Sequence, residues 1–199
     1  MALQLTLFDW PAPAPKPARY SLFLAVFPDP LTANRIGERA ARLRQAHGLR
    51  GRLRPLHHFH VTLHHLGHCS AVPPGLLSTL GQLGRDVTSR VPSFEVTLDR
   101  VLSFGSEGRN RPLVLCGKET ANAALKNLHQ LLGEALAKDG FRVSSTASFT
   151  PHLTLLYDRH GIPEESLEAV TWPVSEVVLV RSETGATKYE AKGRWPLLA

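Results

Sequence analysis

The chain has 199 residues, of which 43% are hydrophobic and 20% are charged, and its formal net charge is +6. This composition is typical of a soluble globular protein, and no apolar run approaches the roughly 20 residues that a membrane-spanning helix needs. The N-terminal segment lacks the features of a secretion signal, and Cys69 and Cys116 match neither a disulfide framework nor a zinc site. We therefore expect a cytoplasmic protein with no membrane partner. The positive charge favours a polyanion such as RNA, although a solvated basic surface explains it equally well.

The first 18 residues differ in composition from the rest of the chain. Prolines alternate with alanine and lysine between Pro11 and Pro17, a pattern that favours an extended, semi-rigid linker. We expect residues 1–18 to form a flexible tail and residues 19–199 to form the folded domain. Near the start, the sequence Gln4-Leu5-Thr6-Leu7-Phe8 resembles the short peptide with which bacterial proteins bind the DNA polymerase sliding clamp. The resemblance implies a clamp partner; a chance match, or a tail folded onto its own domain, is the alternative.

The order of the predicted elements indicates a mixed fold. Strands and helices do not alternate regularly, as they would in a parallel α/β sheet, so the pattern predicts an α+β fold with largely antiparallel sheets. In chain order, hydrophobic periodicity and turn signals predict a strand over 20–27, a helix over 32–47, a strand over 59–66, a helix over 76–90, strands over 94–102 and 113–117, a helix over 121–138, a strand over 150–157 and a closing hairpin of strands 174–182 and 188–195.

A short phrase occurs twice in the chain. Residues 60–63 read His-Val-Thr-Leu, and residues 152–155 read His-Leu-Thr-Leu. Side chains two apart on a strand lie on the same face, so each phrase presents an imidazole and a hydroxyl together, while the residue between them is buried. The two phrases begin close to half a chain length apart. We therefore expect a bilobal molecule, in which two pseudo-symmetric lobes with outer helices each contribute one phrase to a central cleft.

The paired phrases suit in-line displacement at phosphorus. Opening a 2′,3′-cyclic phosphate requires a base that takes a proton from water and an acid that protonates the departing ribose oxygen. Histidine can perform both tasks because its ordinary pKa is about 6.5. His60 and His152 are therefore the candidate catalytic residues, and the Thr62 and Thr154 hydroxyls can hold the non-bridging phosphate oxygens. This chemistry requires no metal and no cofactor.

The phrases and their flanks resemble the paired H-x-T signatures of the 2H phosphoesterase superfamily. The similarity covers residues 59–67 and 151–157 and landmarks at 22–28 and 177–197, and its nearest branch is the bacterial and archaeal RNA 2′,3′-cyclic phosphodiesterases, also named 2′-5′ RNA ligases. The resemblance implies a bilobal α+β fold and hydrolysis of an RNA-terminal 2′,3′-cyclic phosphate to a 2′-phosphate, with reversible 2′-5′ ligation in some members. It further implies His60 as the general acid, His152 as the group that activates water, and both threonines as phosphate ligands.

One position departs from the family pattern. Many members carry an arginine five residues after the second motif histidine, where this chain has Tyr157. The candidate phosphate ligands that could replace that arginine are Arg54, Arg111, Arg159 and Tyr157 itself. Alternatively the substrate differs, as a mononucleotide, a dinucleotide or an ADP-ribose-like compound. A non-catalytic nucleotide-binding module of the same fold, or a phosphodiesterase for another small cyclic nucleotide, is the alternative function. We expect a monomer.

Other residues near the motifs have both structural and functional interpretations. Strand parity places His58 and His64 on the face of His60, where they would add positive potential; a metal site is the alternative, but no carboxylate or cysteine stands at ligand spacing. The basic loop 105–111 could clamp RNA phosphates or be a solvated hairpin loop. Phe59 and Tyr157 share the parity of the buried motif residues, so we expect both in the core.

Overall fold

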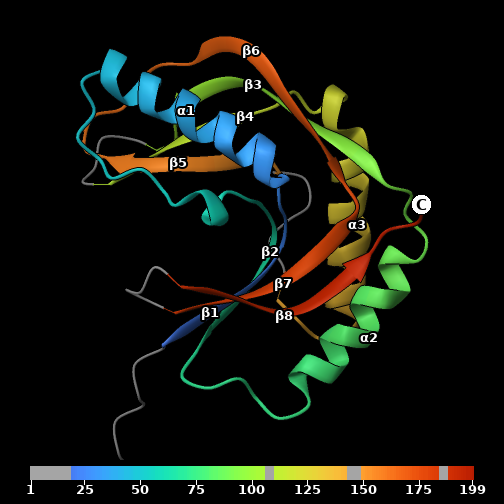
Figure 1. The fold of residues 1–199 in the computed structure, drawn as a ribbon. Helices are drawn as coiled ribbons and strands as arrows, with labels where there is room; N and C mark the ends of the chain where they lie inside the picture. The colour runs from blue at the N-terminus through green and yellow to red at the C-terminus, as the bar shows by residue number, and fades with distance from the viewer. Residues whose placement is uncertain (1–18, 106–109, 143–148, 184–187) are drawn as a thin grey trace, which may run out of the picture.

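Eight strands form one antiparallel sheet in the order β6-β3-β4-β5-β2-β1-β7-β8 (Figure 1), which confirms the predicted α+β fold. The computed structural model describes residues 19–105, 110–142, 149–183 and 188–199. The tail with its candidate clamp peptide, residues 106–109 of the basic loop and residues 184–187 of the predicted hairpin lie outside the described residues. The strands are β1 (Tyr20–Val26), β2 (Val61–Cys69), β3 (Phe94–Ser103), β4 (Arg111–Cys116), β5 (His152–Asp158), β6 (Glu165–Val174), β7 (Glu176–Glu183) and β8 (Tyr189–Pro196).

The sheet consists of two four-stranded halves with the same internal order. In each half the motif strand pairs with the strand that precedes it across a helix: β2 with β1 across α1 (Pro30–Ala46), and β5 with β4 across α3 (Ala123–Lys138). β1 then pairs with β7 and β4 with β3, and β8 and β6 form the edges. The halves meet at one antiparallel contact, Val61 opposite Leu153. This arrangement confirms the two pseudo-symmetric lobes and brings the two phrases together.

Each motif strand carries a β-bulge directly after its threonine. Leu63 has no partner in the β1–β2 ladder, and Leu155 has none in the β4–β5 ladder. A bulge shifts the alternation of side chains by one residue. In both strands the bulged leucine and the residue after it are buried, and the next residue, His65 in β2 or Tyr157 in β5, is exposed. The two halves therefore have the same bulge at the same position as well as the same strand order.

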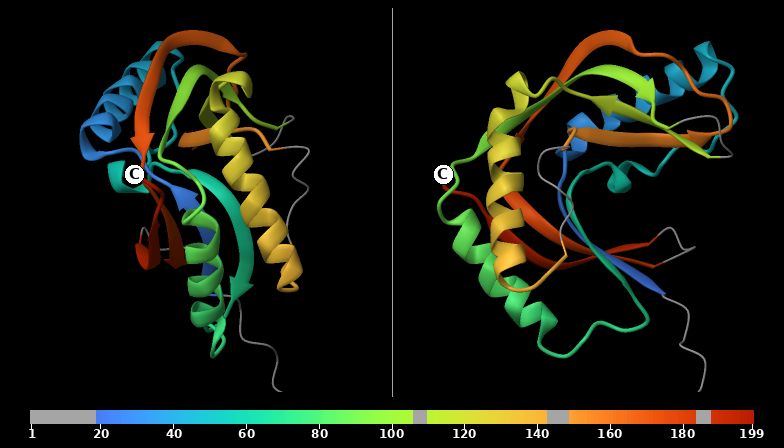
Figure 2. Two further views of the ribbon diagram at one scale, coloured as in Figure 1. Left: turned by 90° about the vertical axis from the view of Figure 1, so that its right-hand side faces the viewer. Right: turned by 180° about the vertical axis from the view of Figure 1, so that it is seen from behind.

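The helices cover the curved sheet and enclose the main core. α1 begins with a proline and is capped by Asp29, whose carboxylate accepts a hydrogen bond from the Thr32 backbone N–H at 2.9 Å. α1 ends just before Gly48, whose φ of 61° favours glycine. α2 (Leu76–Thr88) and α3 pack side by side, whereas α1 packs on β6 (Figure 2). Within the described residues, no helix is long and apolar enough to cross a membrane.

The sequence prediction missed β6, and the reason is its position in the sheet. Pro173 lies inside this strand, and proline cannot donate a ladder hydrogen bond, so it is confined to edges and bulges. β6 is an edge strand that still buries Val170 and Trp172 in the core. The other predicted strands and helices are confirmed, with bounds that shift by at most three residues.

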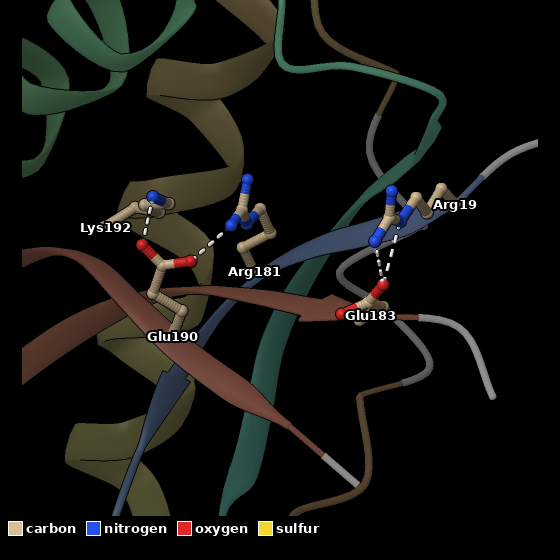
Figure 3. A network of polar contacts seen from close by, with 5 residues as sticks. All are labelled: Arg19, Arg181, Glu183, Glu190 and Lys192. Atoms are coloured by element: carbon tan, nitrogen blue, oxygen red, sulfur yellow. Dashed lines mark hydrogen bonds and ion pairs between the residues drawn. The ribbon is translucent and has the colours of Figure 1, made fainter. Parts of the chain in front are cut away.

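Ion pairs connect the outer ends of β1, β7 and β8 (Figure 3). The Glu190 carboxylate accepts hydrogen bonds from Arg181 and Lys192. Arg19 donates to Glu183 from Nη2 at 2.6 Å and from Nε at 2.8 Å. Exposed pairs of this kind contribute little to the free energy of unfolding. Glu183 and Glu190 offset part of the positive charge of the three basic side chains at this end of the molecule.

Candidate active site

The two motif histidines lie beside the contact that joins the halves of the sheet. Val61 and Leu153, the middle residues of the two H-x-T phrases, face each other in antiparallel register. Continued by one residue on each side, that register sets His60 across from Thr154 and Thr62 across from His152. The charge of a protonated His152 acts on His60 through space. The structure thus brings the four motif side chains to one place.

Matching hydrogen bonds fix the tautomer of both imidazoles. His60 Nδ1 lies 2.7 Å from the carbonyl oxygen of His58, and His152 Nδ1 lies 2.8 Å from the carbonyl oxygen of Thr150. A carbonyl oxygen only accepts, so Nδ1 carries the proton and donates in both residues. Nε2 of each neutral ring is therefore the atom left to take up or release a proton. At His60, Nε2 accepts a hydrogen bond from the Thr62 hydroxyl at 3.1 Å.

Aromatic rings surround the His60 imidazole. The ring of Phe23 stacks on it at 5.0 Å between centroids, and the rings of Phe27 and Tyr189 each lie at 5.6 Å. Burial lowers the pKa of His60 to about 4; the bond to the His58 carbonyl opposes this, and the charge of Arg54 adds to it. His60 is therefore neutral near pH 7 in the free protein. An anion bound between the two histidines would favour its protonated form.

Tyr189 and Arg54 form one wall of the site, and sequence reasoning did not assign Tyr189 a role. Arg54 Nη2 donates to Tyr189 Oη at 3.0 Å, and the Tyr189 ring stacks on His58 at 3.8 Å between centroids. His58 is buried, and burial, followed by the charge of Arg54, lowers its pKa to about 4. A neutral His58 adds no positive potential, so that expectation is wrong. The only signal for Tyr189 was its place in the C-terminal landmark of the family.

The bulges overturn two expectations that rested on strand parity. His64 is buried instead of facing the site, and its Nε2 donates to the carbonyl oxygen of His129 on α3 at 2.8 Å. Tyr157, which we expected in the core, is 42% exposed. Phe59 comes before the first motif and before its bulge, and it is buried as expected. Alternation therefore predicts side-chain direction up to each threonine and fails beyond it.

Asp158 fixes the basic segment that precedes the first motif. Its Oδ2 accepts hydrogen bonds from the backbone N–H groups of Arg50 and Gly51, both at 2.6 Å, and its Oδ1 accepts one from His160 N–H at 2.9 Å. Burial opposes ionisation of this carboxyl group, but the N–H donors outweigh burial and lower its pKa to about 2. Asp158 is thus a charged anchor at neutral pH.

The rest of the basic segment runs along β5. Leu53 forms an isolated bridge with Leu156, and the Arg54 N–H donates to the carbonyl oxygen of Leu155 at 2.8 Å. A Cβ on Gly51 would lie 2.1 Å from the carbonyl oxygen of Tyr157, so only glycine permits this approach. The backbone that carries Arg54 is therefore held rigidly beside the second motif strand.

The other candidate phosphate ligands lie farther from the histidines. Arg111 is paired across the ladder with Asp158, at the end of β5 opposite to His152, and Arg159 follows β5 on the surface. Across the described ranges, neither arginine has a hydrogen bond or ring contact with a motif histidine. Arg54 is the candidate whose charge acts on His60. The Thr154 side chain is half-buried and makes no hydrogen bond to another described residue.

The remaining histidines do not gather into a ligand set. His65 Nε2 lies 2.8 Å from the Ser21 hydroxyl, and the His65 ring neighbours that of His68 at 4.8 Å between centroids. In the part of the chain that the structure describes, no three His, Cys, Asp or Glu side chains are grouped to hold a metal ion.

Two hollows border the wall formed by Arg54 and Tyr189. One has a volume of about 570 Å³, and its lining includes Val178, Val180 and Ala191 next to Tyr189. The other has a volume of about 270 Å³, and its lining consists of Arg52, Leu53, Arg54, Pro55 and Tyr157. The larger hollow has the size of a small-molecule site, and its lining combines apolar side chains with Asp29, His57, Glu176 and Arg194. The smaller one presents two guanidinium groups.

The curved sheet repeats its four-strand order in two halves and sets the two H-x-T phrases face to face, which is the arrangement that the resemblance to the 2H phosphoesterases implies. The chain matches the model of the 2′-5′ RNA ligase superfamily over residues 28–186 and belongs to that family, a branch of the 2H phosphoesterases. No curated protein sequence matches the chain significantly. The family membership confirms the resemblance that the two phrases carry.

Solved structures agree with this assignment. E. coli LigT in complex with 3′-AMP is 25% identical with a TM-score of 0.70, and the match covers 92% of this chain and 100% of that one. The apo form of E. coli LigT matches with 28% identity and a TM-score of 0.67, over 92% of this chain and 99% of that one. Usb1 of Kluyveromyces marxianus, at 12% identity and a TM-score of 0.52, shares the fold over 93% of this chain and 100% of that one.

Proposed function

We propose that the protein hydrolyses an RNA-terminal 2′,3′-cyclic phosphate to a 2′-phosphate without a metal ion. The observation that carries this proposal is the matched pair of imidazoles, each with Nδ1 donating to a backbone carbonyl and Nε2 left to exchange a proton. One acid and one base are what in-line displacement at phosphorus needs. Structures of E. coli LigT in complex with 3′-AMP, ATP and NADP+ support a nucleotide as the ligand.

The residues take the roles that the family resemblance implies. Water attacks phosphorus as the bond to the 3′ oxygen breaks; His152 Nε2 takes the proton of the water, and His60 Nε2 protonates the departing oxygen. The hydroxyls of Thr62 and Thr154 donate to the non-bridging oxygens, and Arg54 supplies positive charge. Because the pKa of His60 is about 4 in the free protein, the bound phosphate anion must raise it before His60 can act as the acid.

The same geometry accommodates a second nucleophile. A 5′-hydroxyl group in place of water would transfer its proton to His152 and form a 2′-5′ phosphodiester bond as the bond to the 3′ oxygen breaks. Hydrolysis and ligation then differ only in which hydroxyl reaches phosphorus. The ligation is reversible because each histidine can return the proton that it took or gave.

Hydrolysis of 2′,3′-cyclic AMP in the presence of EDTA tests the proposal. We expect adenosine 2′-phosphate as the product, and His60→Ala or His152→Ala should each lower kcat by about 10²- to 10⁴-fold. His68→Ala, which removes an exposed histidine outside the site, is the matched control and should retain full activity. Unchanged kcat in both motif variants would contradict the proposal. Tight nucleotide binding without any product would instead support the alternative, a binding module of the same fold.

A separate proposal concerns the tail and rests on its sequence alone. We propose that Gln4, Leu5, Leu7 and Phe8 bind a DNA polymerase sliding clamp as an extended peptide. Deletion of residues 1–10 should abolish capture of the protein by a purified bacterial clamp and leave cyclic phosphate hydrolysis unchanged. Equal capture of the full chain and the deletion variant would contradict clamp binding.

A further inference from the structure

The smaller hollow beside the site, which we call the Arg52 pocket, has no described partner for its positive charge. It is formed by residues 52–55 and Tyr157, and its volume is about 270 Å³. Among the described residues, neither Arg52 nor Arg54 lies within ion-pair distance of a carboxylate, whereas the cations at the ends of β1, β7 and β8 are paired (Figure 3). The pocket therefore combines two guanidinium groups with one exposed phenol ring.

The pocket is held in shape by contacts that do not use its own side chains. The Leu53 bridge and the Arg54 N–H bond fix the backbone against β5, and Asp158 anchors its beginning through the N–H groups of Arg50 and Gly51. The guanidinium of Arg52 remains exposed and available for a ligand. A charged group on a fixed backbone loses less conformational freedom when it binds an anion than one on a mobile loop.

The place of the pocket relative to the histidines sets which part of a substrate can reach it. Arg54 contacts Tyr189, whose ring lies 5.6 Å from the His60 ring, so Arg54 belongs to the rim of the cyclic phosphate site. Arg52 stands two residues farther along the extended segment, a step of about 6–7 Å at the usual rise per residue. In a nucleic acid strand, the next phosphate is separated from the first by one ribose. Arg52 is therefore the next positive charge along the segment, at about the position where the next phosphate of a bound strand would lie.

We propose that the Arg52 pocket binds the phosphate on the 5′ side of the terminal nucleotide, with Tyr157 beside the ribose that connects the two phosphates. This inference rests on the proposed function, because the histidine pair must hold the cyclic phosphate. A cyclic mononucleoside phosphate has a 5′-hydroxyl and lacks the group that Arg52 binds. The pocket thus makes the protein select the ends of RNA chains, or 5′-phosphorylated nucleotides, over cyclic mononucleosides. A guanidinium contact with a phosphate is a charge-assisted hydrogen bond and accounts for such a preference.

Comparison of three substrates tests the selection. We expect kcat/KM to be about tenfold higher for 5′-phosphorylated 2′,3′-cyclic AMP, and for an adenosine dinucleotide with a 2′,3′-cyclic end, than for 2′,3′-cyclic AMP itself. Arg52→Ala should reduce this ratio to about one, mainly through KM. Arg19→Ala, which removes an exposed arginine paired with Glu183, should keep the wild-type ratio. Equal kcat/KM for the three substrates, or an unchanged ratio in Arg52→Ala, would overturn the inference.

A binding measurement separates this inference from the proposed reaction. Calorimetry should show that adenosine 2′,5′-bisphosphate binds about tenfold more tightly than adenosine 2′-phosphate, and that Arg52→Ala removes the difference. If no cyclic substrate is hydrolysed but this difference is found, the reaction is refuted and the pocket stands. If hydrolysis proceeds and the two products bind equally, the pocket is refuted and the reaction stands.

Discussion

At the scale of single residues, the site orients its imidazoles with backbone carbonyl groups. His60 and His152 each donate Nδ1–H to the carbonyl of the residue two positions earlier. A carboxylate in that place would add a negative charge and raise the pKa of His60 further, whereas the His58 carbonyl fixes the tautomer and raises this pKa by less than burial lowers it. His60 therefore stays neutral until an anion arrives. Protonation of His60 and binding of phosphate are coupled in this arrangement.

The coupling predicts a measurable shift of the His60 titration. In the free protein, the imidazole of His60 should titrate near pH 4, because burial penalises its charged form. Saturation with adenosine 2′-phosphate should move the titration to higher pH, since the phosphate anion stabilises imidazolium. NMR signals of the imidazole carbons, assigned with His60→Gln, measure both values. An unchanged titration midpoint in the complex would show that the two events are independent.

The acid and base roles predict different responses to the leaving group. A p-nitrophenyl phosphodiester releases nitrophenolate, which departs without a proton, so an acid is not needed. His60→Ala should lose about 10²-fold or more in kcat on a cyclic phosphate and much less on the nitrophenyl ester. His152→Ala should lose activity on both, because water still needs a base. Absorbance of nitrophenolate reports the second reaction, and the opposite pattern would assign the acid to His152.

The reacting groups can be predicted from the sequence, whereas the residues that surround them cannot. His60, Thr62, His152 and Thr154 can be predicted because each phrase is local and its chemistry follows from residue types. The contact of Tyr189 with His58 cannot, because it depends on how the last strand pairs with β7 and β7 with β1. No residue close to Tyr189 in the sequence indicates that Tyr189 contacts His58.

At the scale of elements, the close approach of the basic segment to β5 depends on Gly51. A methyl group at that position would lie 2.1 Å from the Tyr157 carbonyl oxygen, which is a backbone atom and cannot move aside freely. We expect Gly51→Ala to displace residues 50–54, lower the urea midpoint of unfolding and raise KM, because Arg54 would leave the rim of the site.

A glycine on a helix provides the matched control for that substitution. A Cβ at Gly81 of α2 would meet only the Arg85 side chain, at 3.5 Å, and the backbone there is helical. Gly81→Ala should therefore stabilise the protein by up to about 1 kcal/mol, with no change in KM. An equal gain in stability in both variants would show that the segment accommodates a side chain at residue 51.

Elements with a regular period are the ones that the sequence predicts. The helices and most strands were found because burial on one face repeats along each segment, as with Leu125, Leu128, Leu132 and Leu136 in α3. The bulges after Thr62 and Thr154 produce no repeating pattern in the sequence. A bulge is a property of two paired strands, so its position is set by the partner and by what the extra residue packs against.

At the scale of the whole molecule, the folded state keeps several histidines neutral inside the protein. Burial is the main cause that lowers the pKa of His58, His60 and His129 to about 4, and it also lowers the pKa of His64. In the unfolded chain the same groups have a pKa of about 6.5. The unfolded state therefore binds more protons between these values, and proton uptake favours unfolding in this range.

Stability should consequently be full above pH 6.5 and fall as the pH decreases toward 4, by about 1 kcal/mol per pH unit for each of His58, His60 and His129. Urea unfolding at pH 7.5, 6 and 5, followed by circular dichroism, measures this slope. His129→Met is the matched variant, because His129 Nδ1 is buried without a described hydrogen-bond partner and methionine fills a similar space. The variant should unfold with a pH dependence reduced by about one proton. A wild-type free energy of unfolding that is the same at pH 7.5 and pH 5 would mean that these imidazoles are already charged in the folded protein.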